Sequence, residues 1–152
     1  MKKNKNLLLN NQLCFALYAA TNSITRVYRS KLNKVGITYP QYLVLLVLWE
    51  FDGLTIKGLA TRLLLNSAMI TPIVKRLEKL DLISRKRNMD DERKVNVFLT
   101  SKGKKLENEV SELQKQVALR TGLSDDNFYK LRDTLHNLVD TLSIDQFNSV
   151  VE

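Results

Sequence analysis

The chain has 152 residues, with 24 Lys and Arg against 16 Asp and Glu, which gives a formal net charge of +8. A hydrophobic share of 44% is enough for a packed core and excludes a disordered chain, and five glycines with two prolines are too few for an all-β fold. One cysteine excludes an internal disulfide and a cysteine-based zinc site. No apolar run approaches the roughly 20 residues of a membrane helix, so we expect a cytoplasmic protein with no membrane partner.

The N-terminal third predicts two helices. Apolar residues recur at steps of three and four and predict a long helix over about residues 11–35, ended by Gly36. Thr38 and Gln41 then form a capping-box pattern. The helix that follows is apolar nearly all round until Asp52, which is typical of a helix in the centre of a core.

The middle of the chain, residues 55–99, has the element order of a winged helix-turn-helix. Two short helices are expected at 55–63 and 67–80. The apolar period then changes to two, which predicts short strands at 83–87 and 95–99 in a two-stranded ribbon. A helix pair followed by such a ribbon is the winged form of this DNA-binding motif.

Two long helices are expected at the C-terminal end. Thr100 caps the first, which carries an apolar stripe from Leu106 to Val117 and ends at Gly122. Ser124 begins the second, with acidic residues at its positive dipole end. The fold class predicted from the sequence is therefore mainly α.

The charge is uneven along the chain. From Lys57 to Lys94 there are ten basic and five acidic residues, a net +5, whereas from Arg120 to Glu152 there are three basic and six acidic residues, a net −3. A basic centre favours a polyanion as partner, although a merely solvated surface is the alternative.

The helix over 67–80 has an apolar stripe on one side and short or basic residues on the other. Short residues near the start of such a helix reach base edges in the major groove, and cations further along meet phosphates. The residues expected to bind DNA from this helix are Ser67, Ala68, Thr71, Pro72, Lys75, Arg76 and Lys79.

The ribbon is expected to enter the minor groove. Its candidate DNA-binding residues are Arg85, Arg87, Asp91, Arg93 and Lys94. Since the loop also carries Asp90 and Glu92, a simple phosphate-binding loop is a poor account of it. We expect Asp91 to form a salt bridge that holds the Arg93 side chain rigid in a narrow minor groove.

The stretch NSAMITPIVKRLEKLDLISRKRNMDDERKVNVFLTSKGKKL resembles the recognition helix and wing of MarR-type regulators, and the resemblance spans nearly the whole chain. It implies a single domain over 1–152, with a winged helix-turn-helix lobe at 55–99. It also implies dimerisation helices at 7–36 and 101–146. A homodimer would then bind a pseudo-palindromic operator in double-stranded DNA.

The lone Cys14 lies near the start of the first helix, where the helix dipole favours a thiolate, provided that Asn10 or Asn11 is the N-cap. A small buried apolar residue is the alternative. Tyr18 is one turn further on. Tyr28 is 14 residues on, about 21 Å away at 1.5 Å per residue, and so can reach only the Cys14 of an antiparallel partner, where Tyr39 could join it.

The segment NQLCFALYAA, followed by Tyr28 and GITYPQYLVLLVLWE, closely resembles the organic hydroperoxide resistance repressors, a branch of the MarR family. The resemblance implies that Cys14 is the peroxide sensor, held by Tyr28 and Tyr39 of the partner subunit, with Tyr18 nearby. A single cysteine resembles the one-Cys subgroup, in which the oxidised cysteine condenses with a small cellular thiol or is over-oxidised.

The function expected from the sequence is a dimeric repressor that leaves its operator when organic hydroperoxides oxidise Cys14. Without a Gly-rich phosphate loop, a metal-ligand cluster or a Ser-His-Asp pattern, we expect no cofactor, no metal site and no enzyme activity. Three alternatives stay open: a MarR-type repressor that responds to a small aromatic effector and has a structural Cys14, a thiol peroxidase, and a helical protein-binding adaptor.

Overall fold

The computed structural model describes residues 4–89, 91 and 93–148, with the side chains of 144–148 left out. It divides into two compact units, one up to Gln114 and one from Lys115 onward. Three residues of the expected tail (1–3) and the loop acids Asp90 and Glu92 lie outside the described residues. Among the helices of the described part, none is long and apolar enough to cross a membrane.

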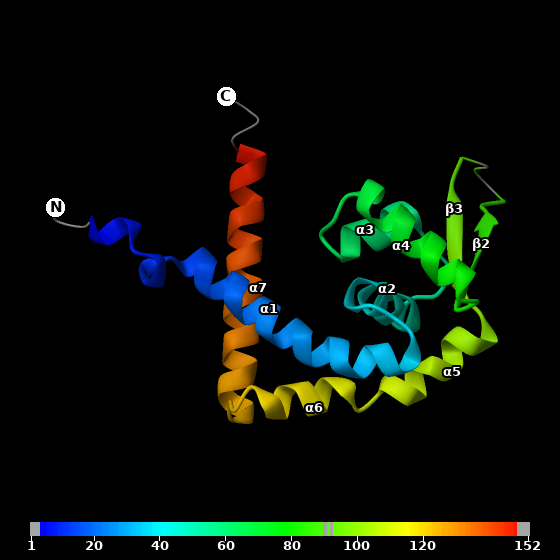
Figure 1. Cartoon of the computed structure of the whole chain (residues 1–152). Coiled ribbons are helices and arrows are strands. Elements are labelled where there is room, and N and C mark those ends of the chain that lie inside the picture. The colour runs from blue at the N-terminus through cyan, green and yellow to red at the C-terminus, as the bar shows by residue number, and fades with distance from the viewer. Residues whose placement is uncertain (1–3, 90, 92, 149–152) are drawn as a thin grey trace. The chain divides into compact units, whose positions relative to one another are not determined.

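Short helical turns, helices and three strands make up the first unit (Figure 1). In chain order they are η1 (Lys5–Leu7), η2 (Leu9–Asn11), α1 (Leu13–Leu32), η3 (Asn33–Val35), α2 (Tyr39–Glu50), β1 (Leu54–Thr55), α3 (Ile56–Arg62), α4 (Ser67–Lys79), β2 (Ile83–Arg87), β3 (Val95–Leu99) and α5 (Ser101–Val110). The next helix, α6 (Leu113–Arg120), spans the boundary between the units, and α7 (Asp125–Asn148) lies in the second.

The first two helices start and end close to the predicted positions. The N-cap of α1 is Gln12, without a side-chain hydrogen bond, so the expected asparagine cap is wrong. After α1 the chain tightens into η3 and turns at Gly36, whose φ of 77° favours glycine. The capping box of α2 is confirmed, because the Thr38 N–H donates to Oε1 of Gln41 at 2.7 Å.

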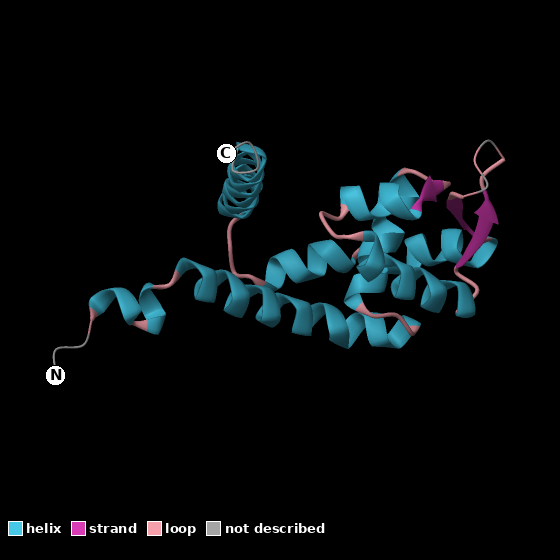
Figure 2. Ribbon diagram, turned by 90° about the horizontal axis from the view of Figure 1, so that it is seen from above, coloured by secondary structure: helices cyan, strands magenta, loops and turns pink. Residues whose placement is uncertain are grey.

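The predicted ribbon is part of a three-stranded antiparallel sheet in the order β1-β3-β2. Leu54 of β1 lies opposite Val97, and Ile83 of β2 lies opposite Leu99. Figure 2 shows the three strands together at one end of the first unit, beside the helices. The two predicted strands are confirmed at their predicted bounds, whereas β1 was missed because a two-residue strand is too short to carry a period.

The core of the first unit lies between α2, α3, α4 and the sheet. The fully buried residues include Val44, Leu45, Leu48, Leu59, Ile70, Val74, Leu77 and Val97. The nearly all-apolar α2 therefore lies in the core, as predicted. Close packing of this kind fixes α4 and the sheet relative to each other.

The predicted long helix after Thr100 is two helices. The Thr100 cap is confirmed, since its Oγ1 accepts from the Gly103 N–H at 3.0 Å. The helix is interrupted after Val110, where the Ser111 hydroxyl donates to the Asn108 carbonyl at 3.0 Å.

The second unit contains the last helix, which begins after Ser124 as predicted. The Ser124 carbonyl accepts from the Phe128 N–H at 2.9 Å, and Asp125 and Asp126 lie in the first turn. Carboxylates there stabilise the positive end of the helix dipole. Several large apolar residues of this unit are exposed, namely Leu119, Leu123, Tyr129, Leu131, Val139 and Leu142.

Candidate DNA interface and cysteine site

The recognition helix α4 begins at an asparagine cap and contains a proline. Oδ1 of Asn66 accepts from the Met69 N–H at 3.0 Å. The N–H that Pro72 lacks would have bonded the carbonyl of Ala68, and both residues are exposed, so water can satisfy that carbonyl. The predicted start of this helix at Ser67 is confirmed.

The two faces of α4 are as predicted. Ile70, Val74 and Leu77 are fully buried. The exposed residues on the other side include Ser67, Ala68, Pro72, Lys75, Arg76 and Lys79, while Thr71 is half-buried and donates to the Ser67 carbonyl at 2.9 Å. This exposed face has short residues at its start and cations toward its end, a composition that suits contact with a groove of DNA.

The wing loop is held by its own hydrogen bonds. The Asn88 N–H donates to the Lys94 carbonyl at 2.9 Å, and the Lys94 N–H donates to the Asp91 carbonyl at 2.9 Å. The Asp91 carboxylate pairs with Nζ of Lys94 at 3.3 Å and accepts from the backbone N–H of Arg93 at 3.1 Å. The predicted salt bridge between Asp91 and the Arg93 side chain is therefore wrong, because the carboxylate bonds the main chain of Arg93 and the side chain of Lys94.

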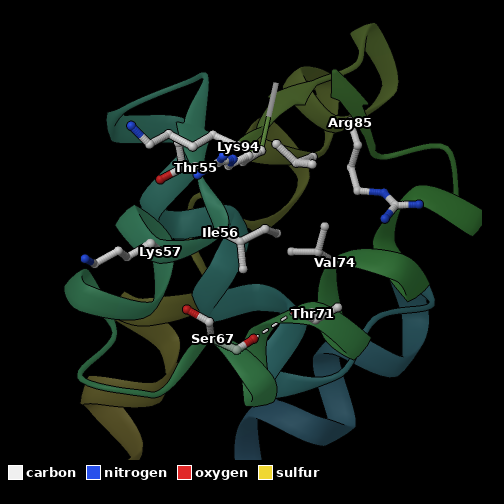
Figure 3. Close-up of a pocket in the computed structure, with 10 residues that line it drawn as sticks. Thr55, Ile56, Lys57, Ser67, Thr71, Val74, Arg85 and Lys94 are labelled. Carbon is white, nitrogen blue, oxygen red and sulfur yellow. Dashed lines mark hydrogen bonds between the residues drawn. The ribbon is translucent and has the colours of Figure 1, made fainter. Parts of the chain in front are cut away.

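A hollow of about 440 Å³ is lined by residues at the start of α3, on α4 and on the strands (Figure 3). It is lined by Thr55, Ile56, Lys57, Ser67, Thr71, Val74, Arg85, Arg93, Lys94 and Val95. Among the described residues of this lining, four side chains are cations, three carry hydroxyl groups and none is a carboxylate. A concave surface with this lining suits a phosphate backbone.

Two cations of the hollow are already paired, Lys94 with Asp91 as described above and Arg85 with Glu78. Nε and Nη2 of Arg85 donate to Oε2 of Glu78 at 2.8 and 2.6 Å. The hydrogen bond from Arg85 lowers the pKa of the Glu78 carboxyl and raises the pKa of the guanidinium. Figure 3 shows the Arg85 side chain extending from its strand toward α4.

The hollow collects part of the predicted DNA-binding set. Ser67, Thr71, Arg85, Arg93 and Lys94 line it, whereas the other predicted residues of α4 and Arg87 of β2 are exposed outside it. The sequence reasoning did not single out Thr55 and Lys57 as DNA contacts. The available signal was that Thr55 caps α3, its Oγ1 accepting from the Gly58 N–H at 3.0 Å, which places Lys57 in the first turn of a helix next to α4.

The cysteine lies at the other end of the first unit. Cys14 is the second residue of α1, so its expected position in the first turn is confirmed. Its side chain is exposed in the single chain, so the alternative of a small residue buried within its own chain is wrong. Tyr18 is also exposed, at 67%. Both lie in the first two turns of α1. Figures 1 and 2 show that this end of α1 is far from the strands.

The other two predicted tyrosines lie together near the end of α1. The ring centroids of Tyr28 and Tyr39 are 4.9 Å apart, and Tyr42 joins them at 5.7 Å from Tyr28. Burial, and then the neighbouring phenols of Tyr42 and Tyr39, raise the pKa of Tyr28 to about 12, and burial also raises the pKa of Tyr39. The phenols therefore stay protonated near neutral pH and can donate hydrogen bonds.

The sequence reasoning missed Tyr42 and Trp49 as members of this aromatic cluster. Trp49 lies 6.2 Å from Tyr42, and its Nε1–H donates to the Gly103 carbonyl at 3.0 Å. The signal was the spacing of Tyr39 and Tyr42, which puts both on one face of a helix. The cluster (Tyr28, Tyr39, Tyr42 and Trp49) thus links α1 through α2 to the start of α5.

Comparisons with known proteins agree with this architecture. The family model described as transcriptional regulator SarA/Rot matches residues 26–110. The HTH-type transcriptional regulator TtmR of Methylorubrum extorquens is 46% identical over 88% of this chain and 69% of its own length. The organic hydroperoxide resistance transcriptional regulator of Bacillus subtilis is 41% identical over 88% of this chain and 91% of its own length.

Among solved structures, reduced AbfR bound to DNA has a TM-score of 0.74 and 35% identity, over 88% of this chain and 94% of that one. AbfR comes from Staphylococcus epidermidis and has also been solved overoxidised on DNA and in a disulfide form. The chain therefore belongs to the SarA/Rot regulators of the MarR type, which are winged helix-turn-helix, DNA-binding transcriptional regulators, and it is similar to the organic hydroperoxide resistance regulators among them.

Proposed function

We propose that this regulator is a dimeric repressor that leaves a pseudo-palindromic operator when an organic hydroperoxide oxidises Cys14. The observation that carries the proposal is the separation of the sensor parts within one chain. The paired phenols of Tyr28 and Tyr39 lie 14 or more positions along the chain from an exposed Cys14. A hydrogen-bonded sensor then needs a second copy to bring thiol and phenols together.

The proposed dimer pairs two α1 helices in antiparallel orientation. The exposed residues Leu13, Phe15 and Ile24 give α1 apolar surface that a partner would cover. Dimers are typical of this family. In this arrangement each Cys14, with Tyr18 beside it, meets the partner subunit's Tyr28 and Tyr39.

The proposed DNA contacts divide into three groups. The exposed face of α4 enters the major groove with Ser67, Ala68, Thr71, Pro72, Lys75, Arg76 and Lys79. The sugar-phosphate backbone passes through the hollow, against Lys57, Arg85 and Lys94. The wing brings Arg87 and Arg93 to the minor groove, and Asp91 shapes its loop.

The proposed chemistry starts with the Cys14 thiolate. It attacks one oxygen of the hydroperoxide, so that an S–O bond forms, the O–O bond breaks and an alcohol leaves after protonation. The resulting sulfenic acid condenses with a small-molecule thiol, forming a mixed disulfide and releasing water. The second sulfur has to come from another molecule because the chain has one cysteine.

The mixed disulfide, rather than added oxygen, is the proposed releasing form. Overoxidised AbfR is bound to DNA in its solved structure, which supports this choice. A bulky adduct at Cys14 would displace the partner's Tyr28 and Tyr39. The displacement would pass through Tyr42 and Trp49 to Gly103 and change the spacing of the two recognition helices.

The test is a titration of the DNA-bound protein with cumene hydroperoxide, with and without free cysteine. The probe is the tightest-binding duplex that the unaltered protein selects from a random-sequence library. We expect about a hundredfold loss of affinity, ~2.7 kcal/mol, when both reagents are present. Cys14→Ser should bind DNA normally and keep its affinity under the same treatment.

Release of Cys14→Ser as readily as the unaltered protein would contradict the proposal and leave a regulator that responds to another effector. Many hydroperoxide turnovers per thiol, without salt-dependent DNA binding, would instead indicate a peroxidase.

A further inference from the structure

An ion pair joins the recognition helix to the wing. Glu78 lies in the last turn of α4, and its Oε2 accepts from both Nε and Nη2 of Arg85 on β2. Each side chain is 35% exposed. Among the described residues, no other salt bridge connects α4 with β2.

The two partners face different surroundings. Arg85 lines the hollow, whereas Glu78 does not. Because both donated bonds use Nε and Nη2, the Nη1 group of Arg85 keeps its donors for a ligand in the hollow. Glu78 therefore bonds the edge of the guanidinium that faces away from the space that the backbone of DNA would occupy.

We propose that Glu78 is a positioning residue for DNA binding, which holds Arg85 so that its free edge meets a phosphate in the hollow. The inference rests on the proposed passage of the DNA backbone through that hollow. An arginine fixed in one rotamer loses less side-chain entropy when it binds than a mobile one does. The same pair fixes the distance between the wing and α4, which have to enter neighbouring grooves.

The direction in which one substitution changes the affinity for DNA distinguishes this positioning role from simple charge repulsion. A carboxylate close to DNA repels phosphates, so removing its charge should raise the affinity if repulsion were its only effect. A positioning role predicts the opposite. Glu78→Gln should lower the affinity although it makes the protein more positive.

The experiment measures the affinity for the library-selected duplex at several salt concentrations. We expect Glu78→Gln to bind about fivefold more weakly and to reduce the slope of log affinity against log salt by about one. Glu50→Gln is the matched control, because Glu50 pairs with Arg62 at 3.8 Å but neither lines the hollow. The control should stay within twofold of the unaltered protein.

A double-mutant cycle supplies the second readout. In an Arg85→Ala background there is no guanidinium to position, so Glu78→Gln should leave the affinity unchanged or raise it. Glu78→Asp keeps the charge and is one methylene shorter, and we expect it to bind about threefold more weakly. Thermal unfolding of each variant verifies that the protein is folded at the assay temperature.

Unaltered or tighter binding by both Glu78→Gln and Glu78→Asp would overturn the inference. Equal losses of affinity with and without Arg85 would do the same. If the unaltered protein itself showed no salt-dependent affinity for the duplex, the proposed DNA interface would fail, which is a different result from failure of the positioning role alone.

Discussion

Two regions of this chain differ in how far their side chains are held in place within one chain. The first is the DNA-reading region, made of α3, α4 and the wing around the hollow, and the second is the cysteine region, made of Cys14, Tyr18, Tyr28 and Tyr39. Around the hollow, side chains from α3, α4 and the wing are already held by caps, ion pairs and buried neighbours within one chain. Cys14 and Tyr18 are exposed, and the stacked phenols of Tyr28 and Tyr39 lie elsewhere. The surface around the hollow is thus held in place within one chain, whereas the parts of the proposed sensor are separated within that chain.

The difference indicates where regulation can act. A preorganised surface binds DNA without ordering costs of its own, so it needs no signal to form. A sensor completed by a second copy changes the relation between two subunits when it reacts. Chemistry at the cysteine can therefore alter the spacing of two reading surfaces and leave the internal packing of each unchanged.

The packing of the reading region is most strongly tested at Gly103. A Cβ at this position would lie 2.0 Å from the carbonyl oxygen of Leu82, which is backbone and cannot move aside cheaply. We expect Gly103→Ala to lower the free energy of unfolding by about 3 kcal/mol. Urea unfolding followed by the fluorescence of Trp49, at fixed protein concentration, measures the loss.

Gly58 provides the control for that substitution. Both glycines occupy the third position of a helix and donate to a threonine cap at 3.0 Å. A Cβ on Gly58 would have its nearest contact at 3.4 Å, so Gly58→Ala should change the stability by less than about 1 kcal/mol. Equal effects at the two positions would show that close approach to Leu82 is unimportant.

The extent of the reading surface is tested at Lys57, which sequence reasoning did not assign to it. Lys57→Ala should weaken DNA binding about fivefold, ~1 kcal/mol, on all sequences alike, and reduce the salt slope by about one. The factor by which hydroperoxide treatment lowers the affinity for DNA should not change, because the substitution lies outside the cysteine region. Lys34→Ala, an exposed lysine outside the hollow, is the control. A loss for Lys34 as large as that for Lys57 would indicate a general charge effect.

Local signals explain how far the sequence alone predicted the fold. The caps at Thr38 and Thr100 and the α4 stripe are encoded by neighbouring residues, and all of them are confirmed. The strand β1 forms by pairing with the distant strand β3, and the interruption after Val110 falls within an apolar stripe that continues from Val110 to Leu113. Neither leaves a periodic pattern in the chain.

In the candidate sites too, features set by helix periodicity could be predicted from the sequence, whereas contacts between separate segments could not. Helix periodicity placed the basic residues of α4 on one exposed face. The partner of Asp91 was wrong because sequence distance does not distinguish Lys94 from Arg93, and loop geometry decides between them. The helical spacing of Tyr39 and Tyr42 was a local signal for the aromatic cluster, whereas the contact of Tyr42 with Tyr28 of α1 and the bond from Trp49 to Gly103 of α5 leave no local pattern.

The smallest expected effect concerns the packing of the aromatic cluster and is a dependence of stability on pH. Tyr28 has a pKa of about 12 in the folded chain against about 10 when unfolded. Between these pH values the folded state keeps a proton that the unfolded state releases. The contribution of Tyr28 to the free energy of unfolding is therefore complete below pH 10 and is lost as the pH rises toward 12. Because Tyr28 is only half-buried, we expect a loss of roughly 0.7 kcal/mol at pH 11.

Tyr28→Phe removes the titrating group and should make this part of the pH dependence disappear. Urea unfolding of both proteins at pH 9 and pH 11 measures the difference, and absorbance of the phenolate follows the titration directly. If the unaltered protein and Tyr28→Phe lost the same stability between the two pH values, Tyr28 would not be held in the packed cluster. The phenols would then be mobile, and a partner's thiol would find no fixed donor there.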